Sequence, residues 1–257
     1  MAELLFWPAF LAYGEAAVAY AGDARRPGSM GRLATWGVRI GWLVQTALLI
    51  AQAAHADGFP WDTWAGSLNL FVWLVVGAYL IWGCRPRYRL LGLAVMPLAA
   101  VLFLVAGLGG GTEAGKDSHY GNLFLTLHVG FVLAAFAGFT LAAALAVLYL
   151  WEERRLQRRS ADILRLKLPS LVTLEKVTSN AIAISLPMLT LGLAIGIVRL
   201  YRHGGSFDAL MAATILAWLV YGAFLALRPT GRAAAHLALA GFAVVIVVRI
   251  VLAGSHF

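Results

Sequence analysis

Apolar stretches of about twenty residues alternate with short polar segments along the whole chain. Eight such stretches are present, at about 3–22, 33–54, 66–83, 90–109, 122–151, 179–200, 207–227 and 233–253. An α-helix of about twenty residues crosses the hydrocarbon core of a bilayer, and a helix satisfies its own backbone hydrogen bonds there. The pattern therefore predicts an all-α, polytopic membrane helix bundle of about eight transmembrane helices.

The composition supports a lipid environment. Of the 257 residues, 61% are hydrophobic and only 12% are charged, which is little charge for the surface of a soluble domain of this length. No detached polar region interrupts the apolar stretches, so we expect residues 1–257 to form a single transmembrane domain. The lone cysteine, Cys84, excludes an internal disulfide and a CxxC redox pair. Phosphate-binding loops and the HExxH and GxSxG motifs are absent from the sequence.

The basic residues predict the orientation of the helices. Fifteen of the twenty Lys and Arg residues fall in segments that would lie on one side of the membrane. They are Arg25, Arg26, Arg32, Arg85, Arg87, Arg89, Arg154, Arg155, Arg158, Arg159, Arg165, Lys167, Lys176, Arg228 and Arg232. Positively charged loops stay in the cytoplasm, so we expect both termini outside and a multi-pass protein of the inner (cytoplasmic) membrane. Because the net charge of +8 is spread over loops, it does not indicate nucleic-acid binding.

One basic segment, residues 152–178, is longer than the others, with the sequence EERRLQRRSADILRLKLPSLVTLEKVT. We interpret it as a basic amphipathic connector that lies on the anionic inner surface of the membrane. A solvated loop that only enforces the topology would give the same pattern. The segment is also the surface on which a membrane or cytosolic protein partner would dock.

Six histidines are the main candidates for chemistry, and five of them are expected in the outer half. His128 lies about six residues into the fifth stretch, roughly 9 Å along a helix. His256 follows the last stretch, at the same outer level. Two neutral imidazoles at one depth on different helices can be the axial ligands of a haem iron. The alternatives are a helix–helix hydrogen bond for His128 and a frayed polar tail for His256.

Two arginines within apolar stretches need partners. Arg249 lies seven residues before His256 and on the same helical face. A haem propionate would supply a carboxylate for it, and so would Asp208, while snorkelling to the outer interface is a third solution. Arg39 and Glu15 form a second possible pair, between the first two stretches, with a structural role.

Small residues recur at every fourth position of the fifth stretch, and two glycines lie four apart in the sixth. These residues are Gly130, Ala134, Gly138, Ala142, Ala146, Gly192 and Gly196. Ridges of small residues allow membrane helices to approach closely, so they predict a tightly packed bundle.

Several short sequence motifs follow one another along the chain. They are Phe59-Pro60 before the third stretch, Leu148-Tyr149-Leu150 at the end of the fifth, Leu174-Glu175 before the sixth and Pro187-Met188-Leu189-Thr190-Leu191-Gly192 within it. In this combination the chain resembles the cytochrome c assembly (CcsA/HemX-like) membrane family, from the second stretch onward. The resemblance implies that His128, in its Leu-His-Val string, and His256, in the closing Gly-Ser-His, are axial ligands of a haem near the outer face.

The chain departs from the full haem-handling members at three places. The segment RLYRHGGSFDALM holds no tryptophan where those members are tryptophan-rich. Ala226 and Gln45 stand where those members have histidines at the inner end of one span and in an earlier span. The resemblance therefore implies the shorter, HemX-like branch, and it argues against an enzyme that attaches haem to apocytochrome.

We expect a membrane protein that binds haem b through His128 and His256, with Arg249 near a propionate. It would handle haem or support cytochrome maturation, with lipid and haem as its partners. The alternative is a non-catalytic regulator of tetrapyrrole synthesis, or an assembly subunit of a larger membrane complex, that docks through residues 152–178.

Overall fold

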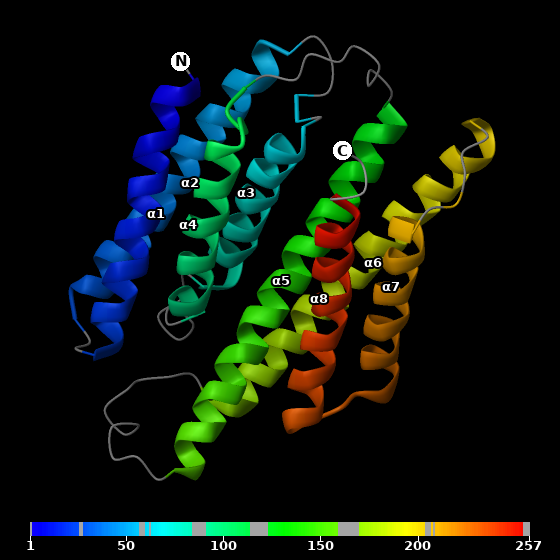
Figure 1. Cartoon of the computed structure of the whole chain (residues 1–257). Helices are drawn as coiled ribbons and strands as arrows, with labels where there is room; N and C mark the ends of the chain where they lie inside the picture. Colours follow the sequence, from blue (N-terminus) through cyan, green and yellow to red (C-terminus); the bar gives the residue numbers. More distant parts are fainter. Residues whose placement is uncertain are drawn as a thin grey trace. The chain divides into compact units, whose positions relative to one another are not determined.

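The structure is a computed structural model, and it describes residues 2–25, 28–56, 60–61, 63–83, 91–113, 123–158, 170–203, 207 and 209–253. Within these residues all regular structure is α-helical, in eight helices (Figure 1). They are α1 (Ala2–Arg25), α2 (Met30–Ala54), α3 (Trp64–Gly83), α4 (Gly92–Leu108), α5 (Leu123–Gln157), α6 (Leu171–His203), α7 (Ala209–Leu227) and α8 (Gly231–Ala253). The predicted all-α fold is confirmed.

Five of the helices are long and apolar enough to cross a membrane. Their candidate spans are Leu4–Ala24, Met30–Ala54, Trp64–Ile81, Thr126–Gln157 and Leu171–Arg202. Helices α4, α7 and α8 contribute shorter apolar segments, Gly92–Leu108, Met211–Leu227 and Gly231–Val244. The chain is therefore a multi-pass membrane protein, while a count of eight spans and the outward placement of both termini stay predictions.

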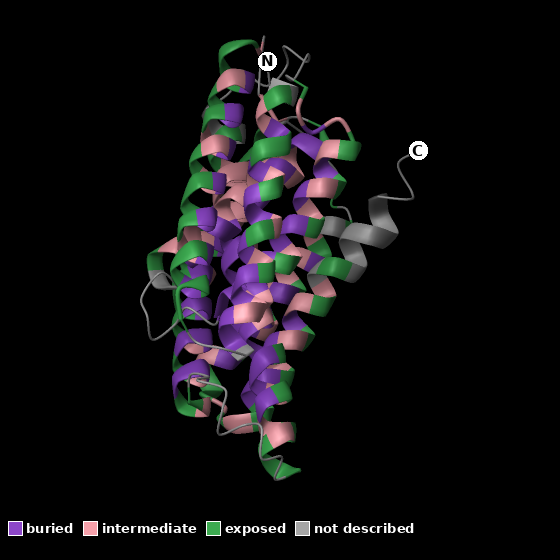
Figure 2. Ribbon diagram, turned by 90° about the vertical axis from the view of Figure 1, so that its left-hand side faces the viewer, coloured by how far each residue is buried: buried purple, intermediate pink, exposed green. Residues whose placement is uncertain are grey.

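The helices group into two compact units, α1 to α4 in the first and α5 to α8 in the second. Each unit has its own buried core. On helices that Figure 2 shows unobstructed, buried positions follow one side and exposed positions the other. On α1, for example, the exposed side carries Leu4, Trp7, Leu11 and Val18, an apolar surface suited to lipid. The expectation of a single transmembrane domain stays a prediction.

In the first unit, small residues let α1 and α2 approach closely. A Cβ atom on Gly37 would lie 3.2 Å from the carbonyl oxygen of Ala12, and one on Gly41 would lie 2.7 Å from the Tyr13 ring. The expected pair of Glu15 and Arg39 is not formed in the described part of this unit. Arg39 instead lies over the Trp36 ring, 5.3 Å from its centroid, so a cation–π contact replaces the expected ion pair.

In the second unit, α5 packs along α6 through the predicted small-residue ridge. A Cβ atom on Gly138 would collide with the side chain of Ser185, and Ala142 and Ala146 are buried. Gly130 is an exception, because no described atom lies within 4 Å of the place where its Cβ would be. The prediction of close packing is therefore confirmed in the middle of α5 and wrong at Gly130.

Both ends of the predicted connector 152–178 are helical extensions. Helix α5 continues to Gln157 and α6 begins at Leu171, whereas residues 159–169 lie outside the described residues. At the second end Leu174 and Val177 are buried while Ser170 and Lys176 are exposed, although the apolar Val172 is exposed as well. A position on the membrane surface stays a prediction for this segment.

Candidate functional site

His128 lies in the second turn of α5, half-buried against α6. Its Nδ1 atom is 2.7 Å from the carbonyl oxygen of Gly192. Because a carbonyl oxygen only accepts hydrogen bonds, Nδ1 carries the proton and donates it. The helix–helix hydrogen bond considered as an alternative for His128 is therefore formed, and it fixes the tautomer of the ring.

The glycines of α6 make room for this contact. A Cβ atom on Gly196 would lie 2.7 Å from Cε1 of His128, and one on Gly192 would lie 2.7 Å from Cγ2 of Val132. A side chain at Gly196 would run into the imidazole, and one at Gly192 would run into Val132. The Pro-x-Leu-Thr-x-Gly string thus ends on the glycine that accepts the hydrogen bond of His128, while Gly196, four residues later, makes room for the ring.

In the neutral ring, a proton on Nδ1 leaves the lone pair on Nε2, and none of the described residues bonds to that atom. This is the arrangement found in histidines that ligate metals, where the second nitrogen donates to a carbonyl or carboxylate and thereby orients the ring. The hydrogen bond and the glycine contacts hold the imidazole in one orientation. The chain thus presents an oriented imidazole near one end of α5.

Thr190 of the same string joins α6 to α7. Its hydroxyl donates to the Leu186 carbonyl oxygen at 2.9 Å and accepts the indole N–H of Trp218 at 2.9 Å. The threonine thus bonds within its own helix and to the next one. This is the only role that the structure gives to that position of the string.

A stacked aromatic pair ties the centre of the second unit together. The rings of Phe139 and Tyr221 are parallel, with centroids 3.8 Å apart. The Tyr221 hydroxyl donates to the Ala238 carbonyl oxygen at 3.2 Å, and Gly241 lies against the same ring. Helices α5, α7 and α8 are therefore held in one register around this tyrosine.

The far end of the unit, near Gln157, is held by two glutamates. Glu175 accepts a hydrogen bond from the backbone N–H of Gly231 at 3.1 Å and so caps the start of α8, next to the buried Leu174. Glu153 pairs with Nε of Arg232 at 2.8 Å. The Leu-Glu string is thereby explained as packing plus a helix cap, whereas the role of Glu153 was not anticipated from the sequence.

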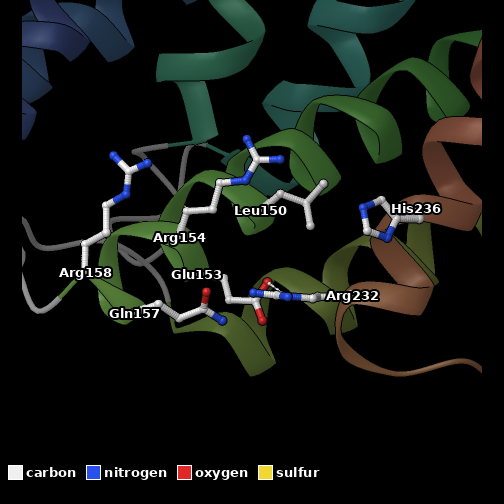
Figure 3. Close-up of a pocket in the computed structure, with 7 residues that line it drawn as sticks. All are labelled: Leu150, Glu153, Arg154, Gln157, Arg158, Arg232 and His236. Carbon is white, nitrogen blue, oxygen red and sulfur yellow. Dashed lines mark hydrogen bonds and ion pairs between the residues drawn. The ribbon is translucent and has the colours of Figure 1, made fainter.

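Next to Glu153 an open hollow of about 390 Å³ lies between α5 and α8 (Figure 3). Its lining residues are Leu150, Glu153, Arg154, Gln157, Arg158, Arg232 and His236. His236 is exposed there and far along the chain from His128. Sequence reasoning missed this cluster because its members come from two segments about eighty residues apart.

The remaining predicted site residues lie wholly or with their side chains outside the described part of the chain. Arg249 belongs to α8, but its side chain lies outside the described part of the chain, as does His256 entirely. The same holds for His119 and for the side chain of His203. Among the described residues no group of three or more His, Cys, Asp or Glu side chains is placed to hold a metal ion. The pairing of His128 with His256 and Arg249 therefore stays a prediction.

The first unit contains a buried network of polar side chains that the sequence did not single out. Tyr13 donates to Gln45 at 2.6 Å, and the Gln45 amide donates to the side-chain oxygen of Asn69 at 2.8 Å. The Gln52 amide donates to the carbonyl oxygens of Gly111 and Glu113, each at 2.9 Å. Gln45 and Gln52 are seven residues apart, hence on one face of α2, and this spacing was the available signal.

Comparisons with known proteins support the family resemblance that the sequence motifs indicated. A family model described as cytochrome C assembly protein matches residues 61–253. The chain is 27% identical to the cytochrome c biogenesis protein CcsA of Microcystis aeruginosa, over 83% of this chain and 82% of that protein. It is 28% identical to protein HemX of Brevibacillus brevis, over 61% and 58% of the two chains, and 23% identical to protein HemX of Bacillus subtilis, over 77% and 74%. No solved structure matches the chain significantly.

Proposed function

Because the chain belongs to the cytochrome c assembly protein family, we propose that it is a membrane protein that binds haem b in haem handling or cytochrome maturation. The observation that carries the proposal is the hydrogen bond from Nδ1 of His128 to Gly192. It orients the imidazole with Nδ1 as the donor, so that Nε2 of the neutral ring is the nitrogen that would bind iron. A bound haem would supply a redox-active iron or a group in transit to an apocytochrome.

The residues around His128 fit this role. The ring is half-buried, so solvent access to it is restricted, and its hydrogen bond to a carbonyl oxygen orients it. Helix α6 lies close against the imidazole at Gly196, and this contact restricts rotation of the ring. These features supply one axial ligand and hold it in place.

The register of α5 and α8 supports His256 as the second ligand. The two helices run antiparallel (Figure 1), and the Glu153–Arg232 pair fixes one level at which they meet. Ala253, the last residue of α8, lies 21 residues after Arg232, and Val132 lies 21 residues before Glu153. In antiparallel helices these two residues are therefore at the same level. The end of α8 thus returns to within about two turns of His128, and His256 follows it by three residues.

Arg249 is proposed to bind a haem propionate. It belongs to the last two turns of α8, and an arginine at that depth needs a carboxylate partner. Its guanidinium group can hold a carboxylate by two parallel hydrogen bonds. An Arg249→Gln variant is expected to keep its b-type spectrum but to retain haem less tightly. A variant that lacks an axial ligand is expected to lose most of its haem.

The test is the reduced-minus-oxidised visible spectrum of the protein purified in mild detergent. We expect sharp b-type Soret and α bands, and at least about tenfold less haem per protein in His128→Ala and in His256→Ala. His236→Ala is the matched control, since this exposed histidine lies at the Glu153 end of α5 and should leave the haem content unchanged. Unchanged haem in folded His128→Ala, with helicity checked by circular dichroism, would refute the axial assignment.

A second candidate function is favoured by the exposed arginines at the end of α5. Arg154 and Arg158 project from the last turns of that helix, where a soluble partner has access to them. A regulator of tetrapyrrole synthesis or an assembly subunit would use this surface for docking and need not bind haem. A featureless spectrum even after addition of hemin, together with loss of partner binding when Arg154, Arg155 and Arg158 are changed to Glu, would select this function instead.

A further inference from the structure

The hollow beside Glu153 is strongly basic. Arg154 and Arg158 extend from the end of α5 and the residue that follows it, while Arg232 and His236 extend from α8, and all four side chains line the hollow (Figure 3). Glu153 is the only acid among the lining residues of this described hollow, and it is already paired with Arg232. The lining therefore carries an excess of positive charge.

The arginines retain unused hydrogen-bond donors. Arg232 meets Glu153 through Nε at 2.8 Å, which leaves its two terminal amino groups for another acceptor. Arg154 lies in the last turn of α5 and Arg158 directly follows its last residue, with its backbone N–H bonded to the Arg154 carbonyl oxygen, so the two like charges repel. Within the described chain neither forms an ion pair. An anion placed in the hollow would relieve that repulsion and accept hydrogen bonds from both helices.

The hollow lies at the edge of the apolar part of α5. Leu150 forms one wall, two residues before Glu152, where the charged sequence begins, and α8 starts at Gly231, one residue before Arg232. A ligand bound here would meet guanidinium groups at one end and an apolar surface at the other. With about 390 Å³ of space, compared with about 30 Å³ for one water, the hollow accommodates an ionic headgroup.

We propose that this hollow binds the phosphate group of an anionic phospholipid, with Arg154, Arg158 and Arg232 on the phosphate oxygens and an acyl chain along Leu150. Arginine is suited to phosphate because its planar group donates two parallel hydrogen bonds. Basic pockets between membrane helices on the cytoplasmic side are general binding places for such headgroups. The site does not depend on haem, so it stands or falls separately from the function proposed above.

The test uses the full-length protein in mild detergent. Its thermal unfolding midpoint is measured during titration with short-chain phosphatidylglycerol, phosphatidylcholine or inorganic phosphate. We expect phosphatidylglycerol alone to raise the midpoint saturably, and the Arg154→Gln/Arg158→Gln double variant to bind it at least about tenfold more weakly. Arg155→Gln is the matched control, because Arg155 stacks on Trp151 at 4.4 Å and does not line the hollow.

Three outcomes would overturn the proposal. Equal stabilisation by phosphatidylcholine would mean that detergent replacement by any lipid is responsible, and equal stabilisation by inorganic phosphate would assign the site to free phosphate. Wild-type affinity in the double variant would remove the arginines from the site. If the double variant is poorly folded, binding of phosphatidylglycerol is measured instead in His236→Asn and, at increasing salt, in the wild-type protein. A phosphate site should bind the lipid more weakly as salt is added.

Discussion

In the first unit the buried side chains of Tyr13, Gln45 and Asn69 bond to one another, whereas in the second unit His128 uses one ring nitrogen and leaves the other available. The first arrangement is closed, because the amide groups of Gln45 and Asn69 are consumed by helices of the same unit. The second is open, because the hydrogen bond to Gly192 orients the imidazole without using its lone pair.

This difference separates polar groups that hold helices together from those that are free to bind a ligand. A fully bonded network in a low-dielectric core stabilises one packing arrangement and has no donor or acceptor left for another molecule. An oriented imidazole with an unused lone pair, and a basic hollow with unused guanidinium donors, do have that capacity. The first unit is therefore expected to respond to substitution through stability, and the second through binding as well.

The largest expected effect breaks the closed network. In Gln45→Leu, Tyr13 loses its acceptor and the Asn69 side-chain oxygen loses its donor, and both groups are buried. We expect the free energy of unfolding in detergent to fall by about 3 kcal/mol. The haem content of the folded fraction should not change, and a loss of haem there would contradict the separation of roles between the units.

The next effect concerns the helix contact of the second unit. In Gly138→Val the new side chain would run into Ser185, whose Cβ would lie 3.1 Å from the added Cβ, and we expect a loss of about 2 kcal/mol in unfolding free energy. Gly130→Val is the matched control on the same helix, because no described atom lies near its added Cβ. Equal destabilisation by the two variants, measured by denaturant titration, would show that the contact at Gly138 is not special.

A smaller effect is expected at the cap of α8. Glu175→Ala leaves the backbone N–H of Gly231 without its 3.1 Å acceptor, which should cost about 1 kcal/mol. Lys176→Ala, at an exposed neighbouring position, should be neutral within about 0.5 kcal/mol. The thermal unfolding midpoints of both variants give the comparison, and a neutral Glu175→Ala would exclude the cap from the stability of the second unit.

The smallest effect is expected for the ion pair at the hollow. The Arg232 side chain is 51% exposed, so solvent screens its attraction to Glu153. We expect Arg232→Gln to change the unfolding free energy by about 0.5 kcal/mol or less, although it should weaken binding of phosphatidylglycerol. A large loss of stability without any change in lipid binding would make this pair structural, like the network of the first unit.

Much of the fold was predictable, because helix formation in lipid follows from the local sequence. An apolar stretch of sufficient length has to be helical in a bilayer, and this predicted the helical class and the positions of most helices. The ends of the helices were predicted less well, since the sixth stretch was placed at 179–200. Helix α6 begins at Leu171, because the amphipathic turn around Leu174 packs in the core and Glu175 caps the neighbouring helix.

The candidate site was predictable in part. The depth of His128 in its apolar stretch, and the strings shared with the cytochrome c assembly family, selected that residue from the sequence. The same reasoning treated Gly192 and Gly196 as packing residues only, and it placed Gln45 as the substitute for a histidine without finding its network. Their partners are distant in sequence, Gly192 being 64 residues from His128 and Asn69 being 24 residues from Gln45.

The sequence by itself thus determined the helices, their apolar faces, the concentration of basic residues in the loops on one predicted side of the membrane and the family to which the chain belongs. Only the tertiary structure decided which nitrogen of His128 bonds to Gly192, which amides close the network of the first unit, and that Arg154, Arg158, Arg232 and His236 line one hollow. The physical reason is that hydrophobic length and charge act locally along the chain. A hydrogen bond or a binding hollow, in contrast, depends on which residues two packed helices bring to the same level.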